Sequence, residues 1–308
     1  MNPRTGCLAA PLLTPTVEGE LDVRGCRINW WKRGDGGPTV LLLHGGGAHS
    51  GWWTDTVAAM QPQQQVVLFD LSGHGDSGRR RSYSYDDWAT EITTVIEHAC
   101  EGPVSLVCHS MSGRLGVLAA AHHPELVDSL VLVDAIIPTH EHESVPHNHP
   151  LKVYPDRATA LARFRLSPAS APTDSDVLSA LAARSIHEVP GGWSWKFDPQ
   201  VFDAAGVEDV NPSLSAVTCP VSSVLGEISP VTDPSMFQKL ETALGRKLAA
   251  TVVVPGADHH FMVDMPAVAA QVLDQLPPPV RKQRPFYTPT ALTSTESPTA
   301  HSHERTEP

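Results

Sequence analysis

The chain has 308 residues, 41% of them hydrophobic, which is enough for one large domain with a sizeable core. Its formal net charge of −12 disfavours nucleic acid and anionic membranes as partners and favours a neutral or apolar small molecule. The five cysteines are scattered and include no CxxC pair, which predicts free thiols and a cytoplasmic location.

Both ends of the chain have the composition of segments outside a packed core. Residues 1–15 contain a short apolar run that is broken by prolines, unlike a signal peptide, and we expect this N-terminus to be flexible. Residues 277–308 are rich in Pro, Thr, Ser, Glu and His, so they cannot bury enough apolar surface to offset their ordering entropy. We therefore predict a disordered tail. Nothing in between approaches the run of about 18 apolar residues that a transmembrane helix needs.

Short strand-like runs alternate with helical patterns between these ends. Residues 26–30 alternate apolar and polar, as an antiparallel strand does, and Arg24 and Gly25 suit the turn before it. Later runs are continuous and rich in Val and Leu, which is typical of strands buried on both faces of a parallel sheet. They lie at residues 40–43, 66–69, 104–107, 130–133, 221–225 and 251–254.

Helical periodicity separates these runs. Residues 86–100 place their apolar side chains on one helical face, with Ser84 upstream as a candidate cap. Strand–helix alternation predicts an α/β fold with a mostly parallel, doubly wound sheet. We assign residues 16–137 and 213–276 to this core.

The strand rhythm stops between residues 138 and 212. Residues 158–166 and 177–186 read as helices, and residues 191–198 read as an aromatic loop. Long structureless loops are uncommon in compact domains. We therefore predict that residues 138–212 form a helical cap, inserted after the sixth strand.

Ser110 directly follows a buried strand, and a helix rich in small residues comes after it. A nucleophilic serine has to protrude from a sharp strand-to-helix turn, where small residues two positions before and after it let the strand and helix approach. Cys108 and Ser112 stand at these positions, where the usual pattern has glycines. The competing interpretation is an ordinary helix start, since serine is a common N-cap residue.

His44 and three glycines follow the strand at residues 40–43. Acyl transfer needs two backbone N–H groups aimed at a developing oxyanion, and glycines let the backbone turn its amides towards that point. A glycine-rich turn and a phosphate loop are the alternatives. The Gly-Lys-Ser/Thr of a Walker A motif is missing, and His44 fits a dinucleotide-binding motif poorly.

His259 follows the last strand in the sequence Pro-Gly-Ala-Asp-His. A histidine in this loop can reach back across the top of the sheet to the serine. A lone histidine is more often structural, but this context favours a functional one. The adjacent His260 is the second candidate.

Residues 69–77, FDLSGHGDS, form a further turn of the pattern D-x-x-G-x-G-x-S. With this turn, the order and spacing of the motifs resemble the α/β-hydrolase superfamily from about residue 19 to residue 276. The resemblance implies that Ser110 is the nucleophile and His259 its general base. It also implies an oxyanion hole formed by the backbone amides of Gly46 and Met111, and no cofactor.

The acid of the catalytic triad is where the sequence departs from this family pattern. Ser229 stands after the seventh core strand, where the aspartate is usually found, and a serine cannot hold a negative charge opposite an imidazolium. We predict that Asp134, at the end of the sixth strand, takes this role, as it does in some members of the superfamily. Glu227 and Asp233 remain alternatives, and a cap or turn role is the competing interpretation of Asp134.

Two further clusters lie within the predicted cap. A histidine-rich stretch could bind a metal, but its spacing in a proline-containing loop favours a solvated entry to the cap, and we predict no metal. It comprises His140, Glu141, His142, His147 and His149. Residues 160–166 and 192–198 resemble the cap of a largely uncharacterised group of bacterial hydrolases. They either line the substrate pocket or simply pack on the core.

The sequence therefore predicts a serine hydrolase that cleaves a carboxylic ester, lactone or related carbonyl substrate through an acyl-enzyme on Ser110. Haloalkane dehalogenases and epoxide hydrolases need an aspartate nucleophile, so Ser110 argues against both. A cofactor-independent dioxygenase, a C–C hydrolase or a lyase with the same triad is the first alternative. A non-enzymatic ligand receptor on the same fold is the second.

Overall fold

The computed structural model describes residues 16–135, 137, 150–169, 175–204 and 210–276. The predicted flexible N-terminus and disordered tail lie outside these residues, as does the histidine-rich stretch at residues 140–149.

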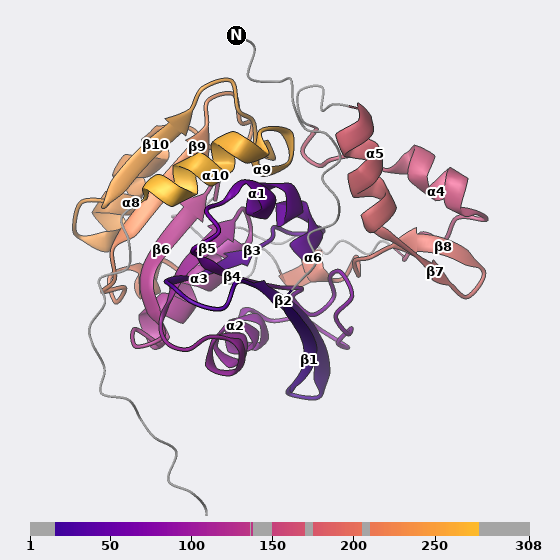
Figure 1. The fold of residues 1–308 in the computed structure, drawn as a ribbon, viewed down its shortest axis with the longest axis horizontal. Coiled ribbons are helices and arrows are strands. Elements are labelled where there is room, and N and C mark those ends of the chain that lie inside the picture. Colours follow the sequence, from indigo (N-terminus) through magenta and orange to yellow (C-terminus); the bar gives the residue numbers. More distant parts are fainter. Residues whose placement is uncertain (1–15, 136, 138–149, 170–174, 205–209, 277–308) are drawn as a thin grey trace, which may run out of the picture.

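Eight strands of the described residues form one sheet, in the order β1-β2-β4-β3-β5-β6-β9-β10 (Figure 1). From β3 onwards its neighbouring strands pair in parallel, whereas β2 runs antiparallel to both β1 and β4. The strands are β1 (Val17–Val23), β2 (Cys26–Arg33), β3 (Thr39–Leu43), β4 (Gln65–Phe69), β5 (Val104–His109), β6 (Val127–Val133), β9 (Val221–Gly226) and β10 (Ala250–Val254).

The strands lie where the apolar runs predicted them. Every residue of β3, β4, β5 and β9 is buried, as expected for Val- and Leu-rich strands that are covered on both faces. The strand β1 was not named from the sequence. It joins β2 through a two-residue turn in which Arg24 and Gly25 both have positive φ angles, as tight β-hairpins require.

Helices cover both faces of the sheet, which confirms the predicted doubly wound architecture. The helices α2 (Tyr85–Ala99), α3 (Ser112–His122) and α8 (Ser235–Leu244) pack on one face. On the other face lie α1 (Thr54–Ala59), α9 (Phe261–Asp264) and α10 (Pro266–Gln275), with the 3₁₀ helix η1 (Ser50–Trp53) beside them. Ser84 caps α2 as expected, because its Oγ accepts a hydrogen bond from the Asp87 N–H at 3.1 Å.

The chain between β6 and β9, called the insertion here, contains helices and a β-hairpin. It comprises α4 (Arg157–Arg163), α5 (Ser175–Arg184), β7 (Ile186–Val189), β8 (Gly192–Trp195), α6 (Val201–Ala204) and α7 (Asn211–Leu214). In Figure 1, α4, α5, β7 and β8 lie together at one side of the sheet.

The hairpin corrects the prediction of an aromatic loop at residues 191–198. Ile186 pairs with Trp195, so the predicted helix at 177–186 ends at Arg184 and its last residue belongs to β7. Pro190 and Gly191 form the turn, and Gly191 and the first strand residue, Gly192, both have positive φ angles. Strands of four residues are too short for their alternation to stand out in a sequence. The predicted helix at 158–166 is also shorter, because the backbone becomes extended at Phe164.

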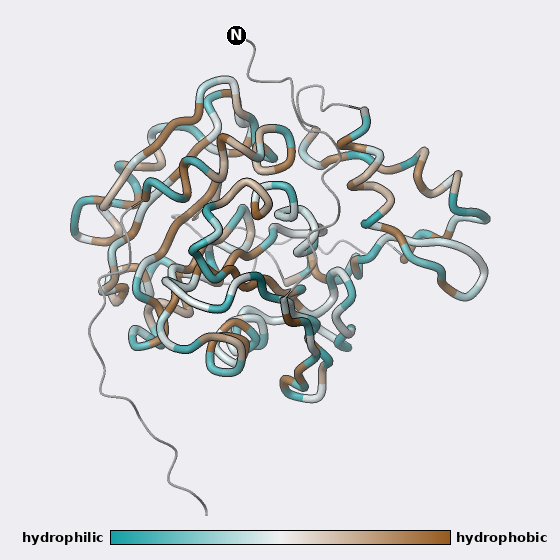
Figure 2. The backbone as a smooth tube through the Cα atoms, in the orientation of Figure 1, coloured by the Kyte–Doolittle hydropathy of each residue, from teal (hydrophilic) through white to brown (hydrophobic). Residues whose placement is uncertain are grey.

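The described residues contain no helix that is long and apolar enough to cross a bilayer. Hydrophobic stretches instead run through the central strands, while the outer loops are largely hydrophilic (Figure 2). Cys26, Cys100, Cys108 and Cys219 are free thiols.

Candidate active site

Ser110 occupies a sharp turn between β5 and α3. Its φ angle is +54°, a left-handed conformation that costs a non-glycine residue of order 1–3 kcal/mol. Two backbone hydrogen bonds hold the turn, from the Ser110 N–H to the Val133 carbonyl and from the Gly113 N–H to the Ser110 carbonyl, each 3.0 Å long. The sequence-predicted strand–serine–helix turn is therefore present.

The helix α3 approaches the sheet closely behind this turn. A Cβ atom on Gly116 would lie 2.5 Å from the Cys108 Sγ, and one on Gly113 would lie 2.5 Å from the Ala135 Cβ. Gly116 thus leaves room for the larger Cys108, which stands where the usual pattern has glycine. Ser112 is fully buried, and its hydroxyl donates a hydrogen bond to the His44 carbonyl. Gly116 was not singled out from the sequence, although a glycine within a helical pattern is a signal of close packing.

His259 lies in the loop between β10 and α9, in contact with Ser110 and Asp134. Its Nε2 is 3.0 Å from the Ser110 Oγ, and its Nδ1 is 2.6 Å from the Asp134 Oδ2. A carboxylate only accepts hydrogen bonds, so the Nδ1 carries the proton and the Nε2 presents a lone pair to the serine. The three side chains form a continuous hydrogen-bonded chain.

Asp134 follows β6 directly, with a φ angle of +45° and no exposed surface. Besides the His259 N–H, its carboxylate accepts hydrogen bonds from the Ser229 and Thr232 hydroxyls, each at 2.6 Å, and from the Gly226 N–H at 3.0 Å. Burial raises the pKa of this carboxyl group, but the hydrogen bond from His259 and then those from the other donors outweigh burial and hold it below its usual value. Asp134 is therefore charged at neutral pH.

The other acid candidates lie on the surface and make other contacts. Glu227 accepts a hydrogen bond from the Gly256 N–H at 2.7 Å, and Asp233 accepts one from the Ser235 N–H at 2.7 Å. Ser229, which stands at the usual position of the acid, instead donates to Asp134. The structure therefore brings Asp134, and neither alternative, to His259.

Two more buried histidines pack around His259. The His109 Nε2–H donates to the His259 carbonyl at 2.9 Å, which ties the histidine loop to the end of β5. The His260 ring lies against Trp52, and burial is the main cause that lowers the pKa of His260 to about 4. His109, His259 and His260 each offer a ring nitrogen within 4.8 Å of the others. His109 was not singled out from the sequence, and its place directly before Ser110 was the available signal.

The glycine loop after β3 runs past Ser110. A Cβ atom on Gly45 would lie 3.0 Å from the Ser110 Cβ, and one on Gly46 would lie 3.3 Å from the Met111 Sδ. Within the described residues, the backbone N–H groups of Gly46 and Met111 have no hydrogen-bond acceptor. Both predicted oxyanion amides therefore lie next to Ser110 and are unpaired.

The turn at residues 69–77 binds the start of η1, which follows this loop. The Asp70 carboxylate accepts hydrogen bonds from the Ser50 N–H at 2.7 Å and from the Asp76 N–H at 2.8 Å. Gly75 has a φ angle of +54°, and a Cβ atom there would overlap the Asp70 carboxylate. The motif is thus a structural one, which holds η1 and the turn after β4 together.

A cavity of about 270 Å³ opens beside Gly46. The loop after β3 contributes Gly46, Gly47, His49 and Trp52, and the insertion contributes most of the remaining wall. That wall is rich in aromatic side chains: Tyr154, Phe164, Trp195, Phe197 and Phe202. The insertion therefore shapes the space next to the candidate oxyanion amides.

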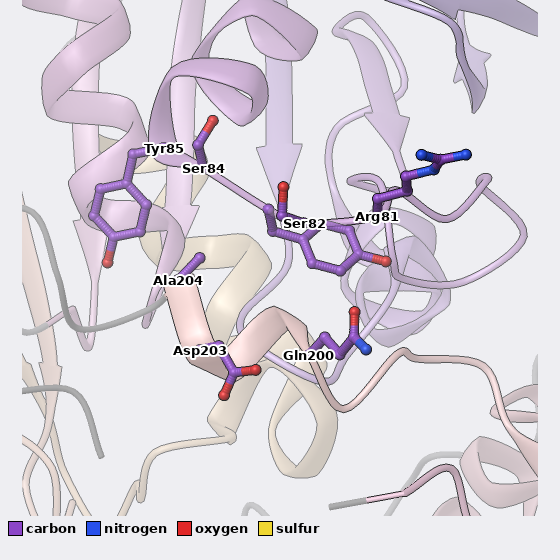
Figure 3. A pocket seen from close by; sticks show the side chains of 8 residues that line it. Arg81, Ser82, Ser84, Tyr85, Gln200, Asp203 and Ala204 are labelled. Carbon is purple, nitrogen blue, oxygen red and sulfur yellow. The ribbon is translucent and has the colours of Figure 1, made fainter. Parts of the chain in front are cut away.

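A second cavity, of about 490 Å³, lies between the segment before α2 and α6 (Figure 3). Its wall includes Arg81, Tyr85, Gln200 and Asp203. Ser110, His259 and Asp134 line neither of these two cavities, but Gly46 lines the smaller one and no predicted site residue lines the larger one. The smaller cavity is therefore the one that adjoins the candidate oxyanion loop.

This fold and this Ser–His–Asp arrangement are those of an α/β hydrolase. A sequence model of the α/β hydrolase fold family matches residues 38–197, and the chain belongs to that family. The predicted family and fold are confirmed.

Among curated proteins, the chain is similar to the 2-(acetamidomethylene)succinate hydrolase of Mesorhizobium japonicum, with 29% identity over 68% of this chain and 76% of the relative. It is also similar to the lipase LipV of Mycobacterium tuberculosis, with 28% identity over 70% of this chain and 85% of the relative. A solved thioesterase domain from the curacin biosynthetic pathway superposes with a TM-score of 0.71 at 25% identity, covering 83% of this chain and 98% of that domain. With its family and these relatives, the chain is an α/β-fold hydrolase.

Proposed function

We propose that the protein is a serine hydrolase that cleaves a carboxylic ester, lactone or related carbonyl compound through an acyl-enzyme on Ser110. The observation that carries this proposal is the hydrogen-bonded chain from the Ser110 Oγ through the His259 ring to Asp134, with distances of 3.0 and 2.6 Å. It has the order nucleophile, base and acid that acyl transfer requires.

The first half of the reaction transfers the acyl group to the protein. The His259 Nε2 takes the proton of Ser110 while the Oγ attacks the substrate carbonyl carbon. The imidazolium that forms is stabilised by the charged Asp134, whose lowered pKa keeps it deprotonated. The proton then passes from His259 to the leaving oxygen, the bond to that oxygen breaks, and an ester on Ser110 remains.

The second half releases the acyl group. A water molecule gives a proton to His259 and attacks the acyl carbon, and the proton returns to the Ser110 Oγ as the ester bond breaks. In both halves the oxygen of the tetrahedral intermediate carries a negative charge. The unpaired N–H groups of Gly46 and Met111 lie beside Ser110 and are available to bind it.

The insertion supplies the substrate-binding wall in this proposal. We keep residues 138–212 as the proposed cap, because the described part of this segment lines the cavity at Gly46. At about 270 Å³ the cavity lies just below the usual range for ligand sites of about 300–1,000 Å³, which suits a small acyl compound. A cytoplasmic location stays a prediction.

The direct test is release of p-nitrophenol from acetate, butyrate and octanoate esters by the wild-type protein, Ser110→Ala and Asp134→Asn. We expect wild-type turnover and a loss of about three or more decades in kcat for Ser110→Ala, as removal of a triad member causes. Asp134→Asn should lose about as much, because the amide removes the charge that holds the His259 tautomer. Circular dichroism should show that both variants are folded.

Trapping the intermediate tests the acyl-enzyme itself. Acid quenching during turnover should leave the acyl group on the peptide that contains Ser110, and a serine-directed fluorophosphonate should label the same peptide. Substrate turnover with no acyl adduct would instead favour histidine-driven lyase, C–C hydrolase or oxygenase chemistry. Tight ligand binding without turnover would favour a receptor.

A further inference from the structure

The cavity at Gly46 differs in charge from the molecule as a whole. The chain has a net charge of −12, yet this cavity is lined by Arg163, Arg165 and Lys196 and by no aspartate or glutamate. All three cations belong to the insertion. A concentration of positive charge in one cavity of an acidic protein indicates an anionic ligand.

The two arginines lack a carboxylate partner in the described part of the chain. The Arg165 Nη1 donates to the backbone carbonyls of Ala162 and Phe164, which are neutral acceptors and leave the guanidinium charge unbalanced. Arg163 is exposed and has no ion pair among the described residues. Lys196 differs, because its Nζ lies 2.7 Å from the carboxylate of Asp76. The unbalanced charge in the cavity therefore belongs mainly to Arg163 and Arg165.

The same cavity adjoins the candidate oxyanion loop. Gly46 lines it and also carries one of the two unpaired amides beside Ser110. Phe164, which stands between the two arginines in the sequence, lines it too, as do Trp195 and Phe202. A ligand in this cavity can therefore contact the arginines, the aromatic side chains and Gly46, whose neighbour Gly45 lies against Ser110.

We propose that the substrate is an anionic carbonyl compound, such as a hemiester of a dicarboxylic acid, whose free carboxylate binds Arg163 and Arg165. This inference rests on the proposed serine hydrolase function. Guanidinium groups match carboxylates in geometry, because two N–H groups can donate in parallel to the two carboxylate oxygens. Ser110 would attack the neutral ester carbonyl and release the alcohol, leaving the acyl group on the serine oxygen. Water would then cleave that ester to release the dicarboxylate and restore the Ser110 hydroxyl.

This inference departs from the neutral or apolar substrate that the net charge favours. Net charge sums groups over the whole surface, whereas charges further away than about 10 Å are largely screened in salt solution. The groups that line a cavity therefore decide which ligand enters it.

Matched substrates test the proposal. Monomethyl adipate and methyl hexanoate have acyl chains of equal length and differ in the terminal carboxylate, as do monomethyl glutarate and methyl pentanoate. Hydrolysis is followed by proton release in a pH-stat. We expect a kcat/KM for the better hemiester at least roughly tenfold above that of its neutral partner, as one charge-assisted contact supplies. Equal or better hydrolysis of the neutral esters would overturn the proposal and leave the serine hydrolase assignment intact.

Variants locate the carboxylate site. Arg163→Gln and Arg165→Gln should each lower kcat/KM for the hemiester by roughly tenfold, mainly through KM, and change that of the neutral ester less than about twofold. Arg157→Gln is the matched control on the same helix, since Arg157 lies over the Trp193 ring and outside the cavity lining. An equal loss on both esters would indicate a structural role for the arginines and contradict the proposal.

Ligand binding to an inactive variant tests the anion site separately from the proposed hydrolase function. Calorimetric titration of Ser110→Ala with monomethyl adipate should show saturable binding that weakens in Arg163→Gln/Ser110→Ala. Such binding together with an inactive wild-type protein would support the anion site and count against hydrolysis. Absence of binding together with active hydrolysis of neutral esters would reject the anion site alone.

Discussion

At the scale of single residues, Ser229 donates a hydrogen bond at 2.6 Å to Asp134, the proposed triad acid at the end of β6. Thr232 and the Gly226 N–H complete the set of donors around the buried carboxylate. Four hydrogen bonds are what make a charged group tolerable at a site with no exposure.

Removing one of these donors should weaken catalysis without abolishing it. In Ser229→Ala the charge of Asp134 remains, but its carboxylate loses a hydrogen bond, so the pKa of Asp134 should rise and its hold on His259 should loosen. We expect kcat for p-nitrophenyl butyrate to fall about tenfold, as loss of one hydrogen bond to a charged group implies, with little change in KM.

The matched control is Ser235→Ala, which removes a serine hydroxyl hydrogen-bonded to the exposed Asp233. This variant should retain wild-type kcat. If Ser229→Ala is equally active, the hydroxyl merely fills space. If it is as inactive as Asp134→Asn, the serine has a larger role than orienting the acid.

At the scale of elements, the contact of α3 with β5 and β6 places the nucleophile. Gly116 lies in the second turn of α3, where a Cβ atom would lie 2.5 Å from the Cys108 Sγ and 2.8 Å from the Leu130 Cδ1. Both of those side chains are fully buried and cannot withdraw into solvent. Glycine has a low helix propensity, but close packing against β5 and β6 leaves no room for a larger side chain at this position.

Gly116→Ala should therefore destabilise the protein, although alanine is the better helix former by about 1 kcal/mol. Overpacking of this kind costs about 1–3 kcal/mol, so the net loss in the free energy of unfolding by urea denaturation should be up to about 2 kcal/mol. In the Cys108→Ala background, where the Sγ is absent, the loss should shrink.

Gly102→Ala is the control, since a Cβ atom there has no neighbour within 4 Å, and it should change the free energy of unfolding by less than about 0.5 kcal/mol. Stabilisation by Gly116→Ala would show that the helix can shift away from the sheet. An identical loss in both backgrounds would place the steric conflict at Leu130 rather than Cys108.

The insertion shows at the same scale where local patterns fail. The four residues of β8 form a strand because β7 pairs with them, and the first residue of β7, Ile186, was predicted as the end of a helix. Ser185, between α5 and β7, hydrogen-bonds to the buried His49 of the core at 3.0 Å. The strand pairing and the hydrogen bond to His49 both depend on residues outside the strand itself. The apolar pattern of four residues does not reveal them.

At the scale of the whole molecule, buried neutral histidines are a recurring feature. His44, His49, His74, His109 and His260 are all at least nine-tenths buried. Burial is the main cause that lowers the pKa of each below its ordinary value, to about 4 for His49 and His260. In the unfolded chain the same rings titrate near pH 6.5.

This difference makes the protein sensitive to mild acid. Between about pH 4 and 6.5 the unfolded chain binds more protons than the native state, so stability is highest above this window and is lost as the pH falls through it. Each histidine contributes up to about 1.4 kcal/mol per pH unit. The lowered pKa of Asp134 acts at lower pH and does not offset this loss. We expect the urea midpoint to drop steeply between pH 7 and 5, at constant m.

Variants of single histidines test whether protonation of the buried histidines causes the loss of stability. His260→Gln should reduce the slope of stability against pH by up to about 1.4 kcal/mol per unit, whereas His123→Gln, with a half-exposed side chain, should leave it unchanged. A flat stability profile between pH 7 and 5 would contradict protonation-linked unfolding.

The sequence by itself determined the α/β architecture, because each parallel strand is a local run of Val and Leu whose burial follows from its own composition. It also singled out Ser110 and His259, since each stands directly after a strand in a short motif. Their catalytic roles, and the boundaries of the predicted cap, stay proposals that the experiments above test.

Only the tertiary structure showed which of Asp134, Glu227 and Asp233 lies beside His259, since this depends on a contact between residues 125 positions apart. It also decided that Gly116 makes room for Cys108, that residues 192–195 pair as a strand, and that three cations share one cavity in an acidic chain. Each of these depends on contacts between segments that are distant in the sequence. Composition and periodicity describe neighbours along the chain, and the chemistry of this site is set by neighbours in space.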